Sequence, residues 1–297
     1  MSFAGGVKTE LCRTAINHKS CVQAEAYGVL LYCNTYTNNE IRIITESDAF
    51  AQRLPMLFRK AFKVSFDRLP TPEGKHIFLI EDPEKLSAVA HTYGGDSGIV
   101  SLHINYGMLE DNQSRAAFLR GAFLAGGSVT DPHKSYHLEM TTSHMSVSRE
   151  MVALMRELDL EPKDAVRKGN HVTYFKQSDL IEDFLTTIGA PLSAMEVMNA
   201  RAEKTLRGSV NRRVNCDAAN LDKVVEAAMA QMEAIHQLQD QGKLAALPEK
   251  LQEAARLRME HPEDTLLQLA QRCDPPASKS AFNHRLRKLV ELSRQEA

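Results

Sequence analysis

The stretch FLRGAFLAGGSVTDP (residues 118–132) decides how the whole chain is interpreted. It begins as an apolar helix rich in small residues and ends in a glycine pair followed by a polar loop. Gly126 and Gly127 stand where such a helix would present a reactive side chain. Because glycine allows close backbone approach and brings no chemistry, the stretch predicts a helix that packs two parts of the fold together.

Length and composition limit the class of protein. A chain of 297 residues with 43% hydrophobic residues predicts about two folded domains with real cores. The chain has neither an apolar run long enough to span a membrane nor an N-terminal export signal, so we expect a cytoplasmic protein with no membrane partner. The absence of a C-x-x-C pair argues against a zinc knuckle and predicts reduced, mostly buried thiols at Cys12, Cys21, Cys33, Cys216 and Cys273.

Two segments of the first 200 residues repeat one order of expected elements: helix, strand, helix, strand, helix. In the first segment these elements cover residues 24–33, 41–45, 48–62, 76–80 and 82–93, and in the second residues 115–127, 136–142, 144–158, 171–176 and 178–189. Matched positions lie 96 residues apart, as in the pairs Thr45 and Thr141, Asp48 and His144, and Ile77 and Thr173. The shared order and spacing indicate an internal duplication.

A duplicated unit led by a small-residue helix resembles the LAGLIDADG homing endonucleases. The resemblance implies an α+β fold of two pseudosymmetric αββαββα halves, residues 1–95 and 96–205. The leading helices would then cross closely at the axis through their small residues, which are Ala24, Ala26, Gly28, Ala117, Gly121, Ala122 and Ala125.

In that family an acidic residue at the eighth motif position holds a metal. Aligned on the motif, YGVLLYCNT (residues 27–35) puts Asn34 at this position and LRGAFLAGG (residues 119–127) puts Gly126 there. Mg²⁺ requires anionic oxygen ligands, so the sequence predicts no metal, no cofactor and no catalytic residue. Asp131 lies five residues beyond Gly126 and is an acid that could substitute, although the first copy has no counterpart.

The stretch GAFLAGGS (residues 121–128) also has the glycine spacing of a phosphate loop, and Ser128 follows at the expected place. The lysine of that motif is replaced by Gly127, and the glycines end a helix instead of preceding one. We therefore reject this alternative.

Positive charge gathers in the last third of a chain whose net charge is −2. Residues 201–213 have a net charge of +4 and residues 276–297 of +3, whereas the segment between them is acidic. Local phosphate contacts explain this distribution better than a general affinity for polyanions, and solvated helix faces are the alternative explanation of the charge taken alone.

After a polar loop within residues 206–246, a connecting helix is expected from residue 219 onward. Pro248 can open the next helix and Pro262 closes it, Asp264 is expected to cap a helix over residues 265–273, and Ser278 a last one. Two helices joined by a tight turn, the second of them cationic, predict a helix-turn-helix domain over residues 247–297.

In the last helix Phe282, Leu286, Leu289 and Val290 recur at helical spacing and would pack on Leu266, Leu269 and Ala270. The opposite side is expected to bind double-stranded DNA, with base readers among its amide, imidazole and guanidinium groups and with flanking phosphate contacts. The expected DNA-binding residues are Ser278, Lys279, Ser280, Asn283, His284, Arg285, Arg287 and Lys288. A solvated surface helix is the alternative.

The degenerate duplicated region, the linker RGSVNRRVNCDAANLDK (residues 207–223) and the helix SKSAFNHRLRKL (residues 278–289) together resemble the WhiA family across nearly the whole chain. The resemblance implies a nucleoid-associated transcriptional regulator without nuclease activity, linked to cell division, chromosome segregation or sporulation. It also implies double-stranded DNA as the partner, with another transcription regulator or RNA polymerase as a further one.

Two other classes stay open: a sensor whose duplicated region (residues 1–205) binds a metabolite or a protein, and a nicking enzyme that uses Asp131. We also expect nonspecific DNA contacts outside the helix-turn-helix domain, from Arg59, Lys60, Lys63, Arg68, Lys168, Arg207, Arg212 and Arg213.

Overall fold

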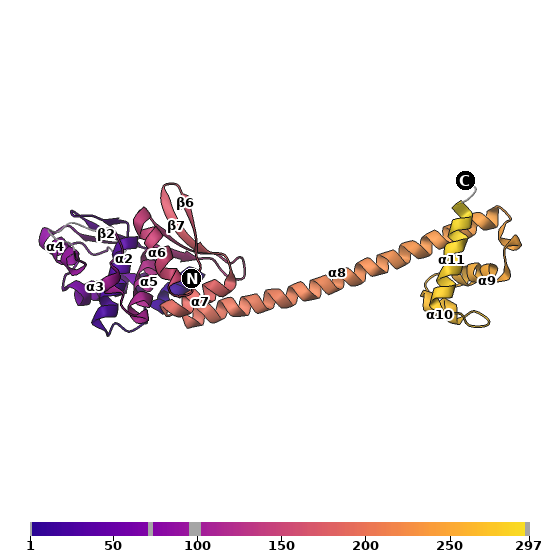
Figure 1. Cartoon of the computed structure of the whole chain (residues 1–297), viewed down its shortest axis with the longest axis horizontal. Helices are drawn as coiled ribbons and strands as arrows, with labels where there is room; N and C mark the ends of the chain where they lie inside the picture. Colours follow the sequence, from indigo (N-terminus) through magenta and orange to yellow (C-terminus); the bar gives the residue numbers. More distant parts are fainter. Residues whose placement is uncertain (1, 71–73, 95–101, 295–297) are drawn as a thin grey trace. The chain divides into compact units, whose positions relative to one another are not determined.

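The computed structural model describes residues 2–70, 74–94 and 102–294. The chain divides into two compact units, Met1–Leu206 and Arg207–Ala297, each with its own hydrophobic core (Figure 1). Among the described residues, no helix combines the length and the apolar character that crossing a membrane requires. All five cysteines are free, and burial raises the pKa of Cys12 and of Cys33 to about 12, so these two thiols stay protonated at neutral pH.

The first unit contains the expected duplication, preceded by a short helix. Its first half comprises α1 (Phe3–Leu11), α2 (Lys19–Tyr32), β1 (Thr35–Tyr36), β2 (Ile41–Thr45), α3 (Asp48–Phe62), β3 (His76–Ile80) and α4 (Pro83–Thr92). Its second half comprises the 3₁₀ turn η2 (Tyr106–Met108), α5 (Asn112–Gly126), β4 (Gly127–Val129), β5 (Leu138–Thr142), α6 (Met145–Arg156), β6 (Lys163–Arg167), β7 (Asn170–Phe175) and α7 (Ser178–Ile188). This α+β order confirms the fold class expected from the sequence.

The helices α2 and α5 cross at the centre of the first unit. A Cβ atom added at Gly28 would lie 2.1 Å from the Phe118 carbonyl oxygen, and one at Gly121 would lie 1.9 Å from that of Glu25. Each glycine thus contacts the backbone of the other helix. Gly121 lies 93 residues after Gly28, and Phe118 lies 93 residues after Glu25, so the two contacts are equivalent. The crossing confirms that small residues hold the two halves together.

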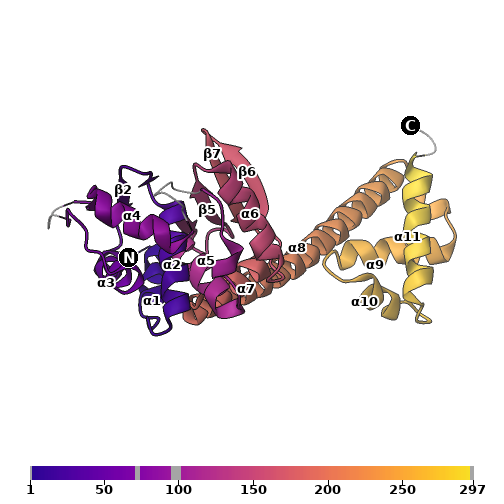
Figure 2. The same ribbon diagram turned by 60° about the vertical axis from the view of Figure 1, so that its left-hand side comes forward.

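The strand register confirms the duplication independently. In the first sheet, ordered β1-β2-β3, Thr45 pairs with His76, and in the second, ordered β4-β5-β7-β6, Thr141 pairs with Val172. Thr141 lies 96 residues after Thr45, and Val172 lies 96 residues after His76, which is the spacing expected from the sequence. In Figures 1 and 2 the strands of both sheets lie on one side of α2 and α5.

The two sheets differ in one strand. The second half has the full αββαββα order, whereas the described part of the first half has no strand equivalent to β6, only an isolated bridge between Arg68 and Leu79. Pro70 follows closely and lacks the N–H group that a continued strand pairing would use. The αββαββα pattern is therefore complete in one half only.

A buried ion cluster links three helices of the first unit. Glu25 in α2 accepts from the Arg53 Nε of α3 at 2.6 Å and from the Arg120 Nε of α5 at 2.9 Å. All three side chains are almost fully buried. Arg53 also donates to the carbonyl oxygens of Cys12 and Thr14, so the guanidinium groups keep hydrogen-bond partners despite burial.

The segment expected to contain a polar loop is helical instead. The helix α8 (Pro191–Asp240) continues through residues 206–223, which contain one glycine and no proline. Asparagine and aspartate lower helix propensity only modestly, so a polar composition alone does not end a helix. The prediction of a loop was wrong because it treated polarity as a break.

The second unit is helical. It contains the end of α8, the 3₁₀ turn η3 (Leu244–Ala246) and three further helices: α9 (Glu249–Glu260), α10 (Leu266–Gln271) and α11 (Lys279–Arg294). Its core joins Ile235 and Leu238 of α8 to residues of the three later helices. The Arg258 side chain of α9 is buried and donates to Gln231 of α8, which fixes the first of these helices to the end of α8.

Candidate nucleic-acid interface

The helix α11 begins where the sequence places its cap. The Ser278 hydroxyl accepts a hydrogen bond from the Ala281 N–H at 3.2 Å, and the Ser278 carbonyl accepts from the Phe282 N–H. Ser278 therefore acts as the N-terminal cap of the helix and satisfies one of the N–H groups that have no partner within its first turn.

The same helix divides into a buried face and an exposed face. Phe282, Leu286 and Leu289 are fully buried and contact Leu269 and Ala270 of α10, as the spacing predicted. Val290 and Leu266 are only partly buried. On the other face Lys279, Ser280, His284 and Arg287 are exposed, while Asn283 is half-buried. A cationic, polar surface thus covers the N-terminal half of α11.

Two of the expected phosphate contacts are ion-paired within the protein. The Arg285 Nη1 lies 3.2 Å from the Glu253 Oε2 of α9, and its side chain is only 17% exposed. Lys288 pairs with Glu291 one turn later on the same helix at 3.2 Å. Arg285 therefore holds α11 against α9, whereas Lys279 and Arg287 are exposed cations of α11.

The turn before α11 differs in detail from the expectation. Thr265 caps α10 through a capping box with Gln268, whereas Asp264 accepts an ion pair from the Arg272 Nε at 2.7 Å. The helix α10 ends at Gln271, so the connection to α11 covers residues 272–278 and is longer than a tight turn. The predicted cap at Asp264 and the predicted helix end at Cys273 were wrong.

The motif positions at the foot of the axial helices carry no carboxylate. The Asn34 Oδ1 accepts a hydrogen bond from the Ile44 N–H at 2.7 Å, which fixes the start of the first sheet. A Cβ atom at Gly126 would lie 2.7 Å from the Thr141 carbonyl oxygen, so no side chain fits there. The carboxylate of Asp131 accepts from the His133 N–H within its own loop. In the described part of the chain no group of three or more potential metal ligands occurs.

The helix crossing gives a second alignment of the two motifs. Counting from the pair Gly28 and Gly121, the offset of 93 residues matches Gly126 with Cys33, and matches Asn34 with Gly127. Neither alignment puts an acidic residue at the metal position.

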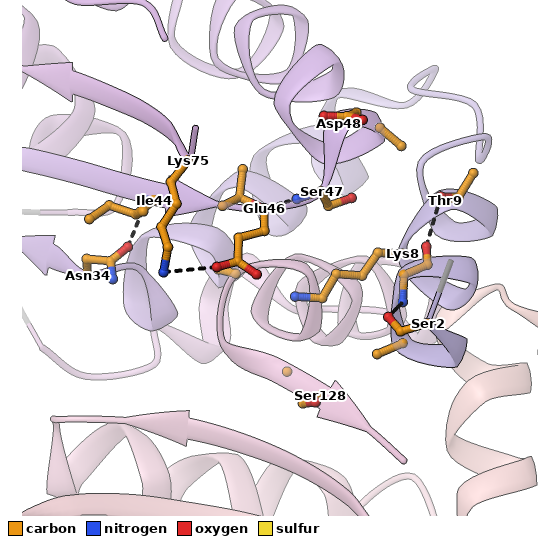
Figure 3. Close-up of a pocket in the computed structure, with 16 residues that line it drawn as sticks. Ser2, Lys8, Thr9, Asn34, Ile44, Glu46, Ser47, Asp48, Lys75 and Ser128 are labelled. Atoms are coloured by element: carbon orange, nitrogen blue, oxygen red, sulfur yellow. Dashed lines mark hydrogen bonds and ion pairs between the residues drawn. The ribbon is translucent and has the colours of Figure 1, made fainter. Parts of the chain in front are cut away.

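A cavity of about 600 Å³ opens at this foot (Figure 3). Its charged lining consists of Lys8 from α1, Lys75 before β3, and Glu46 and Asp48 around the start of α3. Lys8 lies outside the motifs and was not among the residues predicted from the sequence. Its position between the apolar residues Val7 and Leu11 was the available signal, since a lysine beside the buried face of a short helix can lie partly inside the fold.

The basic residues expected to touch DNA from the first unit come from three separate elements. Arg59, Lys60 and Lys63 belong to the end of α3, which packs behind the first sheet, and Lys60 donates to the Ile16 carbonyl oxygen. Arg68 lies at the bridge beside that sheet, and Lys168 lies in the exposed turn between β6 and β7. The other three expected contacts, Arg207, Arg212 and Arg213, belong to the second unit and are exposed on α8.

Comparisons with known proteins agree with this geometry. The model of the WhiA C-terminal HTH domain matches residues 210–293, and that of the WhiA LAGLIDADG-like domain matches residues 115–207. A probable cell division protein WhiA from Ruminiclostridium cellulolyticum is 36% identical over 99% of this chain and 97% of its own length. The chain belongs to the WhiA family. A second such relative, from Alkaliphilus metalliredigens, is 35% identical over 100% of this chain and 98% of its own.

The WhiA fold is also seen in solved structures. Full-length DUF199/WhiA from Thermatoga maritima has a TM-score of 0.62 and 22% identity, with 99% of both chains covered. The N-terminal LAGLIDADG domain of DUF199/WhiA has a TM-score of 0.51 over 63% of this chain and 92% of its own. At 22% identity these likenesses show the fold alone, namely the LAGLIDADG-like unit followed by the helix-turn-helix unit of a WhiA protein.

Proposed function

We propose that this WhiA family member is a sequence-specific DNA-binding transcriptional regulator that does not cleave DNA. One observation carries the proposal: within a helix-turn-helix unit, α11 buries Phe282 and Leu286 and leaves Lys279, Ser280 and His284 exposed at its N-terminal end. In this motif the N-terminal residues of the second helix contact base edges in the major groove.

Cell division is the process that the relatives favour, because both relatives named above are called probable cell division proteins. A map of bound DNA across the genome would identify the sites. Binding of the purified protein to a mapped site and to a random duplex of equal length then tests selectivity. Equal affinity for both duplexes at several salt concentrations would refute sequence-specific binding.

The absence of nuclease activity rests on the foot of the axial helices, where Asn34, Cys33 and Gly126 offer no anionic ligand. Hydrolysis of a phosphodiester in this fold needs metals to activate water and to stabilise the leaving oxygen. We expect supercoiled plasmid carrying a mapped site to stay intact with Mg²⁺ or Mn²⁺. Metal-dependent relaxation that Asp131→Asn abolishes would show that the carboxylate has been relocated.

A further inference from the structure

The cavity at the foot of the axial helices contains a cation without a carboxylate partner. Lys8 reaches into it from α1 (Figure 3). Its Nζ donates to the Leu124 carbonyl oxygen at 3.0 Å, near the end of α5. No ion pair joins Lys8 to a carboxylate among the residues that the structure describes. A neutral carbonyl therefore provides its hydrogen-bond partner.

The two carboxylates of the cavity are already engaged. The Glu46 Oε1 lies 2.9 Å from the Lys75 Nζ, and the Asp48 Oδ1 lies 2.7 Å from the His76 Nε2. Lys8 forms an ion pair with neither acid, although Glu46 interacts electrostatically with its ammonium group. The ammonium has three N–H groups, and the Leu124 carbonyl accepts from one of them, so a further acceptor can bind there.

Hydrogen-bond donors surround the same space. The residues Ser2, which caps α1, and Ser128 of β4 line the cavity together with Lys8 (Figure 3). Phosphate oxygens accept several such bonds, and lysine binds phosphate as a point charge. We propose that this cavity binds a phosphate group, with Lys8 supplying the positive charge at the foot of the axial helices where the motif has no acid to hold a metal.

Burial of Lys8 supports this assignment. Desolvation lowers the pKa of the Lys8 ammonium to about 8, and the opposing effects of Cys12 and Glu46 are smaller. A lysine that only filled space would be replaced by an apolar side chain without loss, because the desolvated charge opposes folding. A bound phosphate would offset that cost by pairing with the ammonium.

The phosphate can belong to the DNA backbone or to a free phosphorylated molecule, and two assays of the full-length protein separate these sources. The DNA case rests on the proposed contact of the first unit with DNA. The first assay measures affinity for a random duplex over a range of salt, and the second measures the melting temperature with inorganic pyrophosphate added. The variants are Lys8→Gln, Lys8→Arg and, as a matched control on the exposed surface, Lys19→Gln.

If the phosphate comes from DNA, Lys8→Gln lowers the salt slope for random DNA by about one unit, since one fewer counterion is released. If it comes from a free molecule, the same variant abolishes a pyrophosphate-dependent rise in melting temperature. Lys8→Arg should retain either effect and Lys19→Gln should change neither. Lys8→Gln without ligand should melt no lower than the parent, which separates lost binding from lost folding.

The proposal is overturned if Lys8→Gln leaves both the salt slope and the pyrophosphate response at parental values, or if the parent shows neither effect. Preference for a mapped site over random DNA is measured in parallel. That preference depends on α11, so its loss would refute the proposed regulator while leaving the phosphate site to be judged by the Lys8 variants.

Discussion

At the scale of single residues, Asn283 is the side chain on which base selectivity is expected to depend. It is half-buried beside the exposed His284, and its amide can donate and accept at once, as recognition of adenine in the major groove requires. Asn283→Ala should cost about 1–3 kcal/mol on the preferred site and relax selectivity at one base pair. Titrations with the mapped site and its single-base variants would measure both effects.

The matched control is Asn220→Ala, which removes the same amide from an exposed position on α8. It should leave affinity and selectivity unchanged. If Asn283→Ala behaves like this control, α11 does not read bases through Asn283.

Lys279 and Arg285 are both cations of α11, but their surroundings predict opposite outcomes. Lys279 is exposed, so Lys279→Ala should weaken binding to all duplexes alike and lower the salt slope by about one unit. Arg285 is paired with Glu253, so Arg285→Ala should lower the melting temperature and leave the slope unchanged. Salt-dependent titrations and thermal melts of both variants decide between the two roles.

Lys8 gives the first unit a characteristic pH dependence. Its pKa is about 8 in the fold, against 10.5 for an ordinary lysine in the unfolded chain, so the unfolded chain binds an extra proton between these values. Stability due to this group therefore rises as pH increases from 8 to 10.5, and below pH 8 the lysine opposes folding. We expect Lys8→Met to melt above the parent at pH 7 and to lose that advantage by pH 10. A difference that stays constant across this range would exclude the depressed pKa.

At the scale of the secondary-structure elements, the crossing of α2 and α5 holds the duplicated unit together. A Cβ atom at Gly121 would lie 1.9 Å from the Glu25 carbonyl oxygen, so Gly121→Ala must push two helix backbones apart. Overpacking of this kind costs about 1–3 kcal/mol or more. Gly6→Ala is the control, because Gly6 lies in α1 with nothing within 4 Å of the added atom. That variant should gain up to about 1 kcal/mol from helix propensity.

Chemical denaturation of both glycine variants would measure these opposite changes. Equal stability of Gly121→Ala and the parent would mean that the two helices do not cross at this glycine.

The elements also show what the sequence can and cannot predict. Strands β2 and β3 were predicted at their observed bounds because alternating or continuous apolar residues mark short strands clearly. The duplication was predictable because matched residues of the two segments lie 96 residues apart in the sequence. The register of both sheets follows the same spacing. The pairing of Arg285 with Glu253 was not, since it joins residues 32 apart across two helices, and a helical pattern shows only which face is polar.

The cavity was beyond prediction for a similar reason. Lys8 lies in a helix that precedes the duplicated motif, and only the tertiary fold brings it to the end of α5. The motif predicted that the metal-binding acids are missing at this place. Lys8, the charged group proposed to act there instead, comes from a segment outside the repeat.

At the scale of the whole molecule, two units with separate cores share one chain, so each should bind DNA in its own way. The fragment of residues 207–297 should keep the preference for the mapped site, because α11 and all its packing partners lie within it. The fragment of residues 1–206 should bind duplexes without selectivity and with a steep salt dependence. Linking the two raises the effective concentration of the second contact.

The full chain should therefore bind a long duplex carrying the site more tightly than the fragment of residues 207–297 does, by about tenfold or more. On a duplex that covers the site alone, with no flanking DNA for the first unit, this advantage should disappear. Titrations of both proteins with long and short duplexes test the expectation. If the full chain and the fragment bind the long duplex equally, the first unit does not touch DNA, and its phosphate would have to come from a free molecule.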